Sequence, residues 1–308
     1  MKIYLDSIGC RLNQSEIETI ARQFVLSGHE IIDTPAEADV TVINTCAVTA
    51  AAASDSRGKI RQAQRAGCPT VLVTGCWSNV DPDGAANLPG VHSVIRNEDK
   101  DFLVRDYLSL TPEVFDSILA SDEPRIALPG KQQRTRAFIK VQDGCDNFCT
   151  YCITRIARGE PRSSSAARVL HDIHAAERAG VKEAVLTGVH LASWGQDLDP
   201  LMHLKDLVTV LLRRTTIPRI RLSSLEPWDL DAEFFALFND PRLCPHLHLP
   251  LQAGSDTVLK RMARKITTAE FSALVASARA VVPELAITTD IIVGFPGETE
   301  EQFEEGLR

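Results

Sequence analysis

Residues 137–152 read Ala-Phe-Ile-Lys-Val-Gln-Asp-Gly-Cys-Asp-Asn-Phe-Cys-Thr-Tyr-Cys, and this stretch decides the fold of the second half of the chain. Residues 137–142 are expected to form a strand, and Cys145, Cys149 and Cys152 follow it with C-x3-C-x2-C spacing. Thiolates are the ligands of iron–sulfur clusters, and three of them leave one iron of a four-iron cube open for a substrate or cofactor. The alternative is a structural zinc site, although such a site takes four ligands.

Further candidate strands follow the cysteine loop at regular spacing, with helices between them. The strands are expected at residues 184–187, 220–223, 246–251 and 286–293, and the helices include 165–179 and 205–214. This order predicts a partial (β/α) barrel in which the strand ends carry the chemistry. Five strands followed by an acidic helical stretch that stops at Arg308 are expected to leave the barrel incomplete at its C-terminus.

The first third of the chain alternates strands and helices in the manner of a Rossmann-like parallel sheet. Strands are expected at 2–8, 39–44, 70–74 and 93–96, and helices at 15–27 and 50–66. Cys10, Cys46 and Cys76 each follow one of the first three strands. Because the carboxyl ends of parallel strands share one edge, these cysteines are expected to converge as a second three-cysteine cluster site. The alternative is three unrelated small buried hydrophobes.

The composition is that of an ordinary globular protein. The 308 residues are 44% hydrophobic and 24% charged, which excludes a disordered or fibrous chain and suits about two domains. We expect an N-terminal domain at 1–98, a linker at 99–134 and a second domain at 135–308. No signal peptide or membrane-spanning run is evident, so a cytoplasmic protein with no membrane partner is predicted. Its cysteines should then be reduced or metal-bound, with Cys68 and Cys244 structural.

The two cysteine sets together resemble the radical S-adenosylmethionine (SAM) methylthiotransferase family. Tyr151 fills the aromatic position of the superfamily pattern C-x3-C-x-aromatic-C. The resemblance extends over nearly the whole chain and includes residues 9–13, 44–49, 74–76, 157–159, 186–189, 249–252 and 290–298. The sequence departs from the family after Cys152, where Ile-Thr-Arg replaces the usual proline and aromatic, and after Cys76, where Trp-Ser-Asn replaces Tyr-Ala-Gln. Members that modify tRNA also continue past this C-terminus, so the resemblance implies a truncated chain.

The resemblance implies two [4Fe–4S] clusters and SAM as cofactors, and no catalytic residue is assigned beyond the cluster ligands. The cluster on Cys145, Cys149 and Cys152 would generate the 5′-deoxyadenosyl radical from SAM. The cluster on Cys10, Cys46 and Cys76 would carry or relay sulfur, and a second SAM would donate the methyl group. An electron donor such as flavodoxin or ferredoxin and a sulfur donor are the implied partners. Contacts to SAM are expected from Tyr151, Gly188, Val189, Glu226, Gln252 and Asp290, although Gly188 suits a plain turn and Glu226 a surface carboxylate equally well.

The substrate implied by the resemblance is the tRNA anticodon stem-loop. The runs Gly-Cys-Arg-Leu-Asn at 9–13 and Gln-Asp-Gly-Cys at 142–145 favour methylthiolation of C2 of N6-threonylcarbamoyladenosine at position 37. The alternatives are isopentenyladenosine-37, an aspartate of a ribosomal protein, or an inactive iron–sulfur remnant.

Charge along the chain indicates where such an RNA would be held. The net charge is −8, yet residues 125–168 hold 9 basic and 3 acidic residues, net +6. A basic segment of this kind can supply the phosphate contacts, which weaken with salt. The candidates are Arg134, Arg136, Arg155, Arg158 and Arg162. The alternatives are a solvated basic face and, for Arg158, a brace of the cysteine loop.

Overall fold

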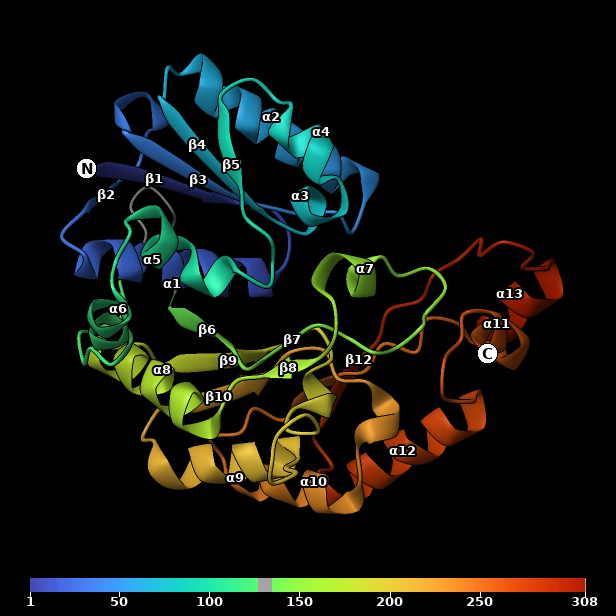
Figure 1. The fold of residues 1–308 in the computed structure, drawn as a ribbon. Coiled ribbons are helices and arrows are strands. Elements are labelled where there is room, and N and C mark those ends of the chain that lie inside the picture. The colour runs from blue at the N-terminus through green and yellow to red at the C-terminus, as the bar shows by residue number, and fades with distance from the viewer. Residues whose placement is uncertain (127–134, 308) are drawn as a thin grey trace. The chain divides into compact units, whose positions relative to one another are not determined.

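A computed structural model describes residues 1–126 and 135–307 as two compact units that interleave along the chain (Figure 1). Unit 1 comprises Met1–Lys140, Ile153–Gly159 and His174–Val181, and unit 2 comprises Val141–Cys152, Glu160–Ile173 and Lys182–Arg308. Both units combine parallel strands with helices, so the predicted α/β class is confirmed. No helix among the described residues is long and apolar enough to cross a bilayer.

Unit 1 is built on a five-stranded parallel sheet with strand order β2-β1-β3-β4-β5. All six residues of the central strand β3 are buried, as its β-branched sequence Val-Thr-Val-Ile-Asn-Thr requires in a sheet covered on both faces. The sequence missed only the short edge strand β2 in this sheet. The strands are β1 (Lys2–Ser7), β2 (Glu30–Ile32), β3 (Val40–Thr45), β4 (Thr70–Gly75) and β5 (Val91–Val94).

Helices cover both faces of this sheet (Figure 1). On one face Ile17, Ile20 and Phe24, at helical spacing on α1, pack with Leu5 and Val42. On the other face a second cluster joins Ile60 of α2 and Trp77 of α3 to Ile43 and Val73. The remaining elements of unit 1 and its boundary are α1 (Arg11–Leu26), η1 (Pro35–Glu37), α2 (Ala50–Arg65), α3 (Cys76–Val80), α4 (Pro82–Ala86), η2 (Lys100–Phe102), α5 (Leu103–Tyr107), α6 (Pro112–Leu119), β6 (Arg136–Lys140), α7 (Thr154–Arg158) and α8 (Ala166–Arg178).

The segment expected to be a linker is largely folded. Leu103 and Val104 of α5 are buried in the same cluster as α1, and Phe115 and Ile118 of α6 are buried too. Within the predicted linker 99–134, residues 100–119 therefore include helices with buried apolar side chains, which are too short for their apolar spacing to stand out in the sequence. Of the predicted linker, residues 127–134 lie outside the described part.

Unit 2 contains parallel pairs of short strands separated by helices. β9 (Glu183–Thr187) pairs with β10 (Arg219–Leu222), β11 (His246–His248) pairs with β12 (Ala286–Thr288), and a bridge between Ser224 and His248 continues from β10 toward β11. The predicted strand 286–293 is regular only over β12, and its pairing resumes at a single parallel bridge between Gln252 and Ile291. The other elements are β7 (Gln142–Asp143), β8 (Arg162–Ser163), η3 (Leu191–Ser193), α9 (Leu204–Arg214), η4 (Pro227–Asp229), α10 (Ala232–Ala236), η5 (Leu237–Asn239), α11 (Asp256–Arg261), α12 (Thr268–Val281) and α13 (Glu300–Gly306).

Candidate functional site

The side chain of Gln142 holds the start of the loop that carries Cys145, Cys149 and Cys152. The Gln142 side-chain amide donates to the carbonyls of Asp143 and Gly144, both at 2.8 Å, and its oxygen accepts from the His190 N–H at 2.8 Å. One buried side chain thus ties the start of the cysteine loop to the residues that follow β9. Gly188, directly after β9, packs against the same side chain, because a Cβ added at Gly188 would lie 3.0 Å from the Gln142 side chain.

The first cysteine of the loop meets a buried histidine. A ring nitrogen of His190 lies within 4.8 Å of the Cys145 sulfur, and its Nε2 lies 2.7 Å from an Asp229 carboxylate oxygen. Burial alone would lower the pKa of His190, but the bonds to Asp229 and Cys145 raise it to about 10. The imidazolium therefore places a positive charge beside Cys145. Cys145, Asp146 and His190 also form the one group of three metal-ligating side chains within 4.8 Å of one another among the described residues.

The second cysteine meets a buried arginine. Burial raises the pKa of the Cys149 thiol, while the Arg264 guanidinium and the Tyr151 hydroxyl act in the opposite direction. Arg264 Nη1 lies 3.9 Å from Cys149 Sγ, and Nη2 lies 2.8 Å from a Glu226 carboxylate oxygen. Cys152, the third cysteine, is exposed.

The predicted SAM contacts fall at several strand ends of unit 2. Tyr151 packs at the edge of a hydrophobic cluster that includes Leu251 and Met262. Gly188 and Val189 directly follow β9. The Glu226 carboxylate is paired with Arg264, so it is not a free surface carboxylate.

Gln252 and Asp290 are brought together by their backbones. The Gln252 N–H donates to the Asp290 carbonyl at 2.9 Å, and Gln252 has a left-handed φ of 80°. The exposed Asp290 carboxylate lies 3.2 Å from His248 Nε2.

In unit 1 the cysteines follow three neighbouring strands. Cys10 comes after β1, Cys46 after β3 and Cys76 after β4, and the register aligns Ser7 with Asn44 and Thr45 with Gly75. Burial raises the pKa values of the Cys46 and Cys76 thiols, and the charge of Cys10 raises both further. The sheet edge therefore brings the sulfurs of Cys46 and Cys76 within electrostatic reach of Cys10.

Two glycines allow this close approach. A Cβ on Gly9, whose φ is +99°, would lie 2.6 Å from Cys46 Sγ. A Cβ on Gly75, whose φ is +103°, would lie 2.4 Å from the Thr45 backbone. Neither position accepts a side chain, because both the backbone conformation and the space require glycine.

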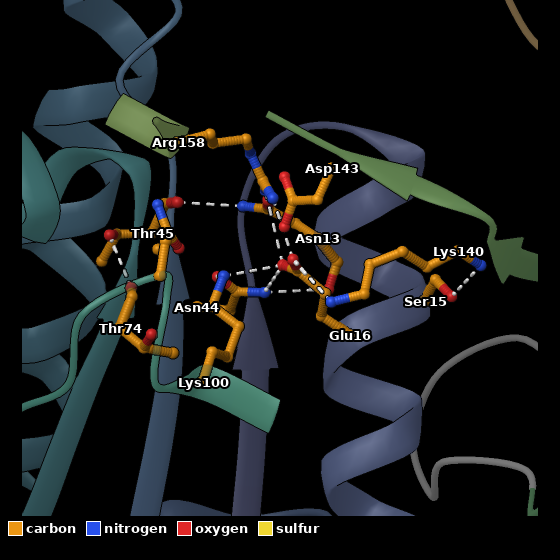
Figure 2. A network of polar contacts seen from close by, with 12 residues as sticks. Asn13, Ser15, Glu16, Asn44, Thr45, Thr74, Lys100, Lys140, Asp143 and Arg158 are labelled. Atoms are coloured by element: carbon orange, nitrogen blue, oxygen red, sulfur yellow. Dashed lines mark hydrogen bonds and ion pairs between the residues drawn. The ribbon is translucent and has the colours of Figure 1, made fainter. Parts of the chain in front are cut away.

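A buried polar network stands behind these cysteines (Figure 2). The Glu16 carboxylate accepts from Lys100 Nζ at 2.7 Å, from Arg158 Nη1 at 2.9 Å and from the Asn44 amide at 3.0 Å. Arg158 Nη2 also donates to Asn13 Oδ1 at 2.5 Å. Asn13 in turn donates to the carbonyl of Thr45, the residue before Cys46, at 2.9 Å. The network thus joins the start of α1 and the end of β3 to α7 and η2.

Arg158 is a correction to the predicted RNA contacts. Its side chain is 1% exposed and bound to Glu16, so it braces the interior of unit 1 and presents no surface to a phosphate. Arg136 and Arg162 are exposed, Arg155 is partly exposed, and Arg162 lies 3.7 Å from the Asp143 carboxylate. Arg134 lies outside the described residues.

Sequence reasoning missed the charged partners of the cysteines: Glu16, Lys100, His190 and Arg264. Lys100, His190 and Arg264 lie far along the chain from the cysteines beside them, within segments whose pattern predicts only a helix or a loop. A buried charge inside an apolar face was the available signal at Glu16 alone, on the helix predicted at 15–27.

Comparison with known proteins supplies the family. Residues 139–308 match the radical SAM superfamily, and residues 2–95 match an uncharacterised protein family, UPF0004. The threonylcarbamoyladenosine tRNA methylthiotransferase MtaB of Bacillus subtilis is 38% identical over 97% of this chain and 68% of that protein. MtaB of Thermotoga maritima is 37% identical over 99% of this chain and 70% of that protein.

Less similar proteins match this chain in sequence or in fold. A tRNA-2-methylthio-N(6)-dimethylallyladenosine synthase of Anoxybacillus flavithermus is 32% identical over 99% of this chain and 60% of that protein. The solved structure of the radical SAM methyltransferase TsrM from Kitasatospora setae superposes with a TM-score of 0.69 at 15% identity, covering 99% of this chain and 70% of that one. The fold prediction, including its radical SAM part, is thereby confirmed. The chain belongs to the radical SAM superfamily and, within it, to the methylthiotransferase family of enzymes.

Proposed function

We propose that this enzyme attaches a methylthio group to C2 of N6-threonylcarbamoyladenosine at position 37 of tRNA. The observation that carries the proposal is the identity of 35–38% to five relatives named for this activity, against 32–33% to three relatives named for the dimethylallyladenosine reaction. The runs at 9–13 and 142–145 favour the same substrate. The enzyme then acts in the cytoplasm, where tRNA and the implied electron and sulfur donors are available.

The radical SAM family implies one [4Fe–4S] cluster and SAM, and the donor set of unit 2 fits that cluster. Three thiols from one loop supply the required ligand type, and the cations His190 and Arg264 beside Cys145 and Cys149 offset the negative charge that thiolate ligands bring to such a cluster. When bound, the cluster supplies one electron for the cleavage of SAM. The chain's own part is to hold the thiolates through Gln142, His190 and Arg264. The residues proposed to hold SAM are Tyr151, Gly188, Val189, Glu226, Gln252 and Asp290.

The second cluster, on Cys10, Cys46 and Cys76, is a further part of the proposal. Three thiols at one sheet edge, backed by the cations Lys100 and Arg158, have the ligand type and the charge that an anionic iron–sulfur group requires. Two such sites predict about eight irons per chain after anaerobic reconstitution, at four per cluster. Alanine at Cys10, Cys46 and Cys76 should halve the iron and leave SAM cleavage measurable. Alanine at Cys145, Cys149 and Cys152 should halve the iron and abolish SAM cleavage.

Control variants at Cys68 and Cys244 should keep all the iron. Full iron in the variant lacking Cys10, Cys46 and Cys76 would show that the second cluster is wrongly assigned.

The substrate is tested by mass spectrometry of tRNA nucleosides. A strain lacking the gene should lose 2-methylthio-N6-threonylcarbamoyladenosine, and the intact gene should restore it. A gene carrying alanine at Cys145, Cys149 and Cys152 serves as the matched control and should not. Loss confined to the methylthio mark on dimethylallyladenosine, or on a ribosomal protein, would contradict the proposal.

A further inference from the structure

Arg264 is a buried cation beside one of the cysteines of the radical SAM loop. Its side chain is 1% exposed, and its Nη1 lies 3.9 Å from Cys149 Sγ. Its Nη2 pairs with Glu226 at 2.8 Å and donates to the Pro250 carbonyl. The guanidinium also lies over the Trp228 ring, 4.5 Å from its centroid. The planar group is thus fixed on three sides, and its remaining end points toward the sulfur.

The surroundings of Arg264 do not use all of its donors. Arginine is almost never fully buried unless it is paired, and each guanidinium presents five N–H donors. Within residues 1–126 and 135–307, the Nε–H of Arg264 has no hydrogen-bond partner. An arginine with a purely structural role would be sufficiently held by its contacts with Glu226 and Pro250, without a contact to Cys149. Because the Nε of Arg261 also lacks a hydrogen-bond partner among the described residues, it is the position of Arg264 Nη1, 3.9 Å from Cys149 Sγ, that links this guanidinium to the cysteine loop.

Charge and hydrogen bonds at the ligand sulfurs set the reduction potential of an iron–sulfur cluster. Reduction adds a negative charge, which a nearby fixed cation stabilises. We propose that Arg264 is a positioning residue that orients Cys149 and raises the reduction potential of a cluster bound by Cys145, Cys149 and Cys152. This inference rests on the cluster assignment of the proposed function. Glu226, which shares the guanidinium, limits the effect by offsetting part of its charge.

The test is the midpoint potential of that single cluster. The full chain is prepared with alanine at Cys10, Cys46 and Cys76, reconstituted anaerobically, and reduced by one electron from dithionite at a series of set potentials while the paramagnetic signal is followed. Arg264→Met should make the midpoint more negative by at least about 59 mV, which is a tenfold change in the equilibrium constant of a one-electron couple. Arg264→Lys, which keeps the charge without the planar fork, should give a smaller shift.

Arg261→Gln is the matched control. Arg261 ends α11, binds the Gly297 carbonyl and Gln302 through its side chain, and should leave the midpoint unchanged. Should Arg264→Met fail to fold, Arg264→Gln keeps a donor for Pro250 and carries the same expectation. No cluster signal in the protein with Arg264 intact would overturn the proposed function. A normal signal with the same midpoint in every Arg264 variant, whatever their melting temperatures, would overturn this inference alone.

Discussion

Glu16 holds a negative charge in the interior of unit 1 because two cations reach it. Although burial alone would raise the pKa of this carboxyl group, Arg158 and Lys100 hold it well below its ordinary value. Burial lowers the pKa of Lys100, and Glu16 counteracts that effect. A buried ion pair adds little net stability compared with apolar packing, but removal of one partner leaves a charge without its counterion. Removal of any one charged side chain from this network is therefore expected to destabilise unit 1.

The pH dependence of stability should reveal this carboxylate. Because the folded pKa of Glu16 is depressed, its contribution is full above the unfolded pKa of about 4.3 and is lost as pH falls toward the folded value. Glu16→Gln should cost about 3–5 kcal/mol at neutral pH and flatten the acid limb of stability against pH. Urea unfolding between pH 3 and pH 7 measures both effects. Glu98→Gln, in an exposed pair with Arg96, is the control and should change little; equal losses in the two variants would contradict the role of burial.

At the scale of elements, the close approach of the ends of β3 and β4 requires glycine at position 75. Gly75 lies in a region of φ and ψ that only glycine occupies freely, and its Cα faces the Thr45 backbone. Because Gly75 has no side chain, the ends of the two strands lie close enough together to place Cys46 and Cys76 at one edge of the sheet.

Gly75→Ala should therefore damage unit 1 more than an alanine elsewhere. Strain and overpacking together predict a loss of roughly 2–6 kcal/mol in unfolding free energy. Gly28→Ala is the matched control, since Gly28 also has positive φ (+83°) but no atom within 4 Å of an added Cβ, and it should cost about 1–2 kcal/mol. Thermal unfolding distinguishes the two. If both variants lose the same stability, the close contact with Thr45 is unimportant.

The sequence predicted the elements that leave a local pattern, and it did not predict contacts between residues that lie far apart along the chain. β-branched runs and the cysteine after each strand predicted β1, β3 and β4, because burial in a parallel sheet leaves a local pattern. β2 has three residues, and α5 has five, which is too short for periodicity to show. The contacts of Lys100, Arg158 and Arg264 join residues distant in sequence, so no local pattern reports them. For that reason the sequence did not distinguish a phosphate contact from an internal brace at Arg158.

At the scale of the whole molecule, tRNA must bind a protein of net charge −8. Contacts to phosphate then depend on the local basic segment, and each releases counterions on binding. With Arg158 committed to Glu16, the described candidates are Arg136, Arg155 and Arg162.

Replacement of these three arginines by glutamine should weaken tRNA binding and its salt dependence together. Each lost phosphate contact lowers the slope of log K against log salt by about 0.7–0.9, so the slope should fall by about 2–3. Filter binding or anisotropy at several salt concentrations measures the slope. Glutamine at Arg213 and Arg214, exposed at the end of α9, is the control. An unchanged slope in the triple variant would remove the basic segment from the RNA interface.

The interleaving of the two units along the chain limits how this protein can be divided or recombined. A fragment that ends at residue 98 keeps Glu16 but loses Lys100 and Arg158, and with them the neutralisation of its buried carboxylate. The sheet is therefore not a transferable cassette, although its strands end by Val94. In a chimaera with another catalytic half, the donor must supply α7 and the stretch up to Val181 as well, so breakpoints that keep every salt bridge of the sheet lie deep inside what the sequence presents as the second domain.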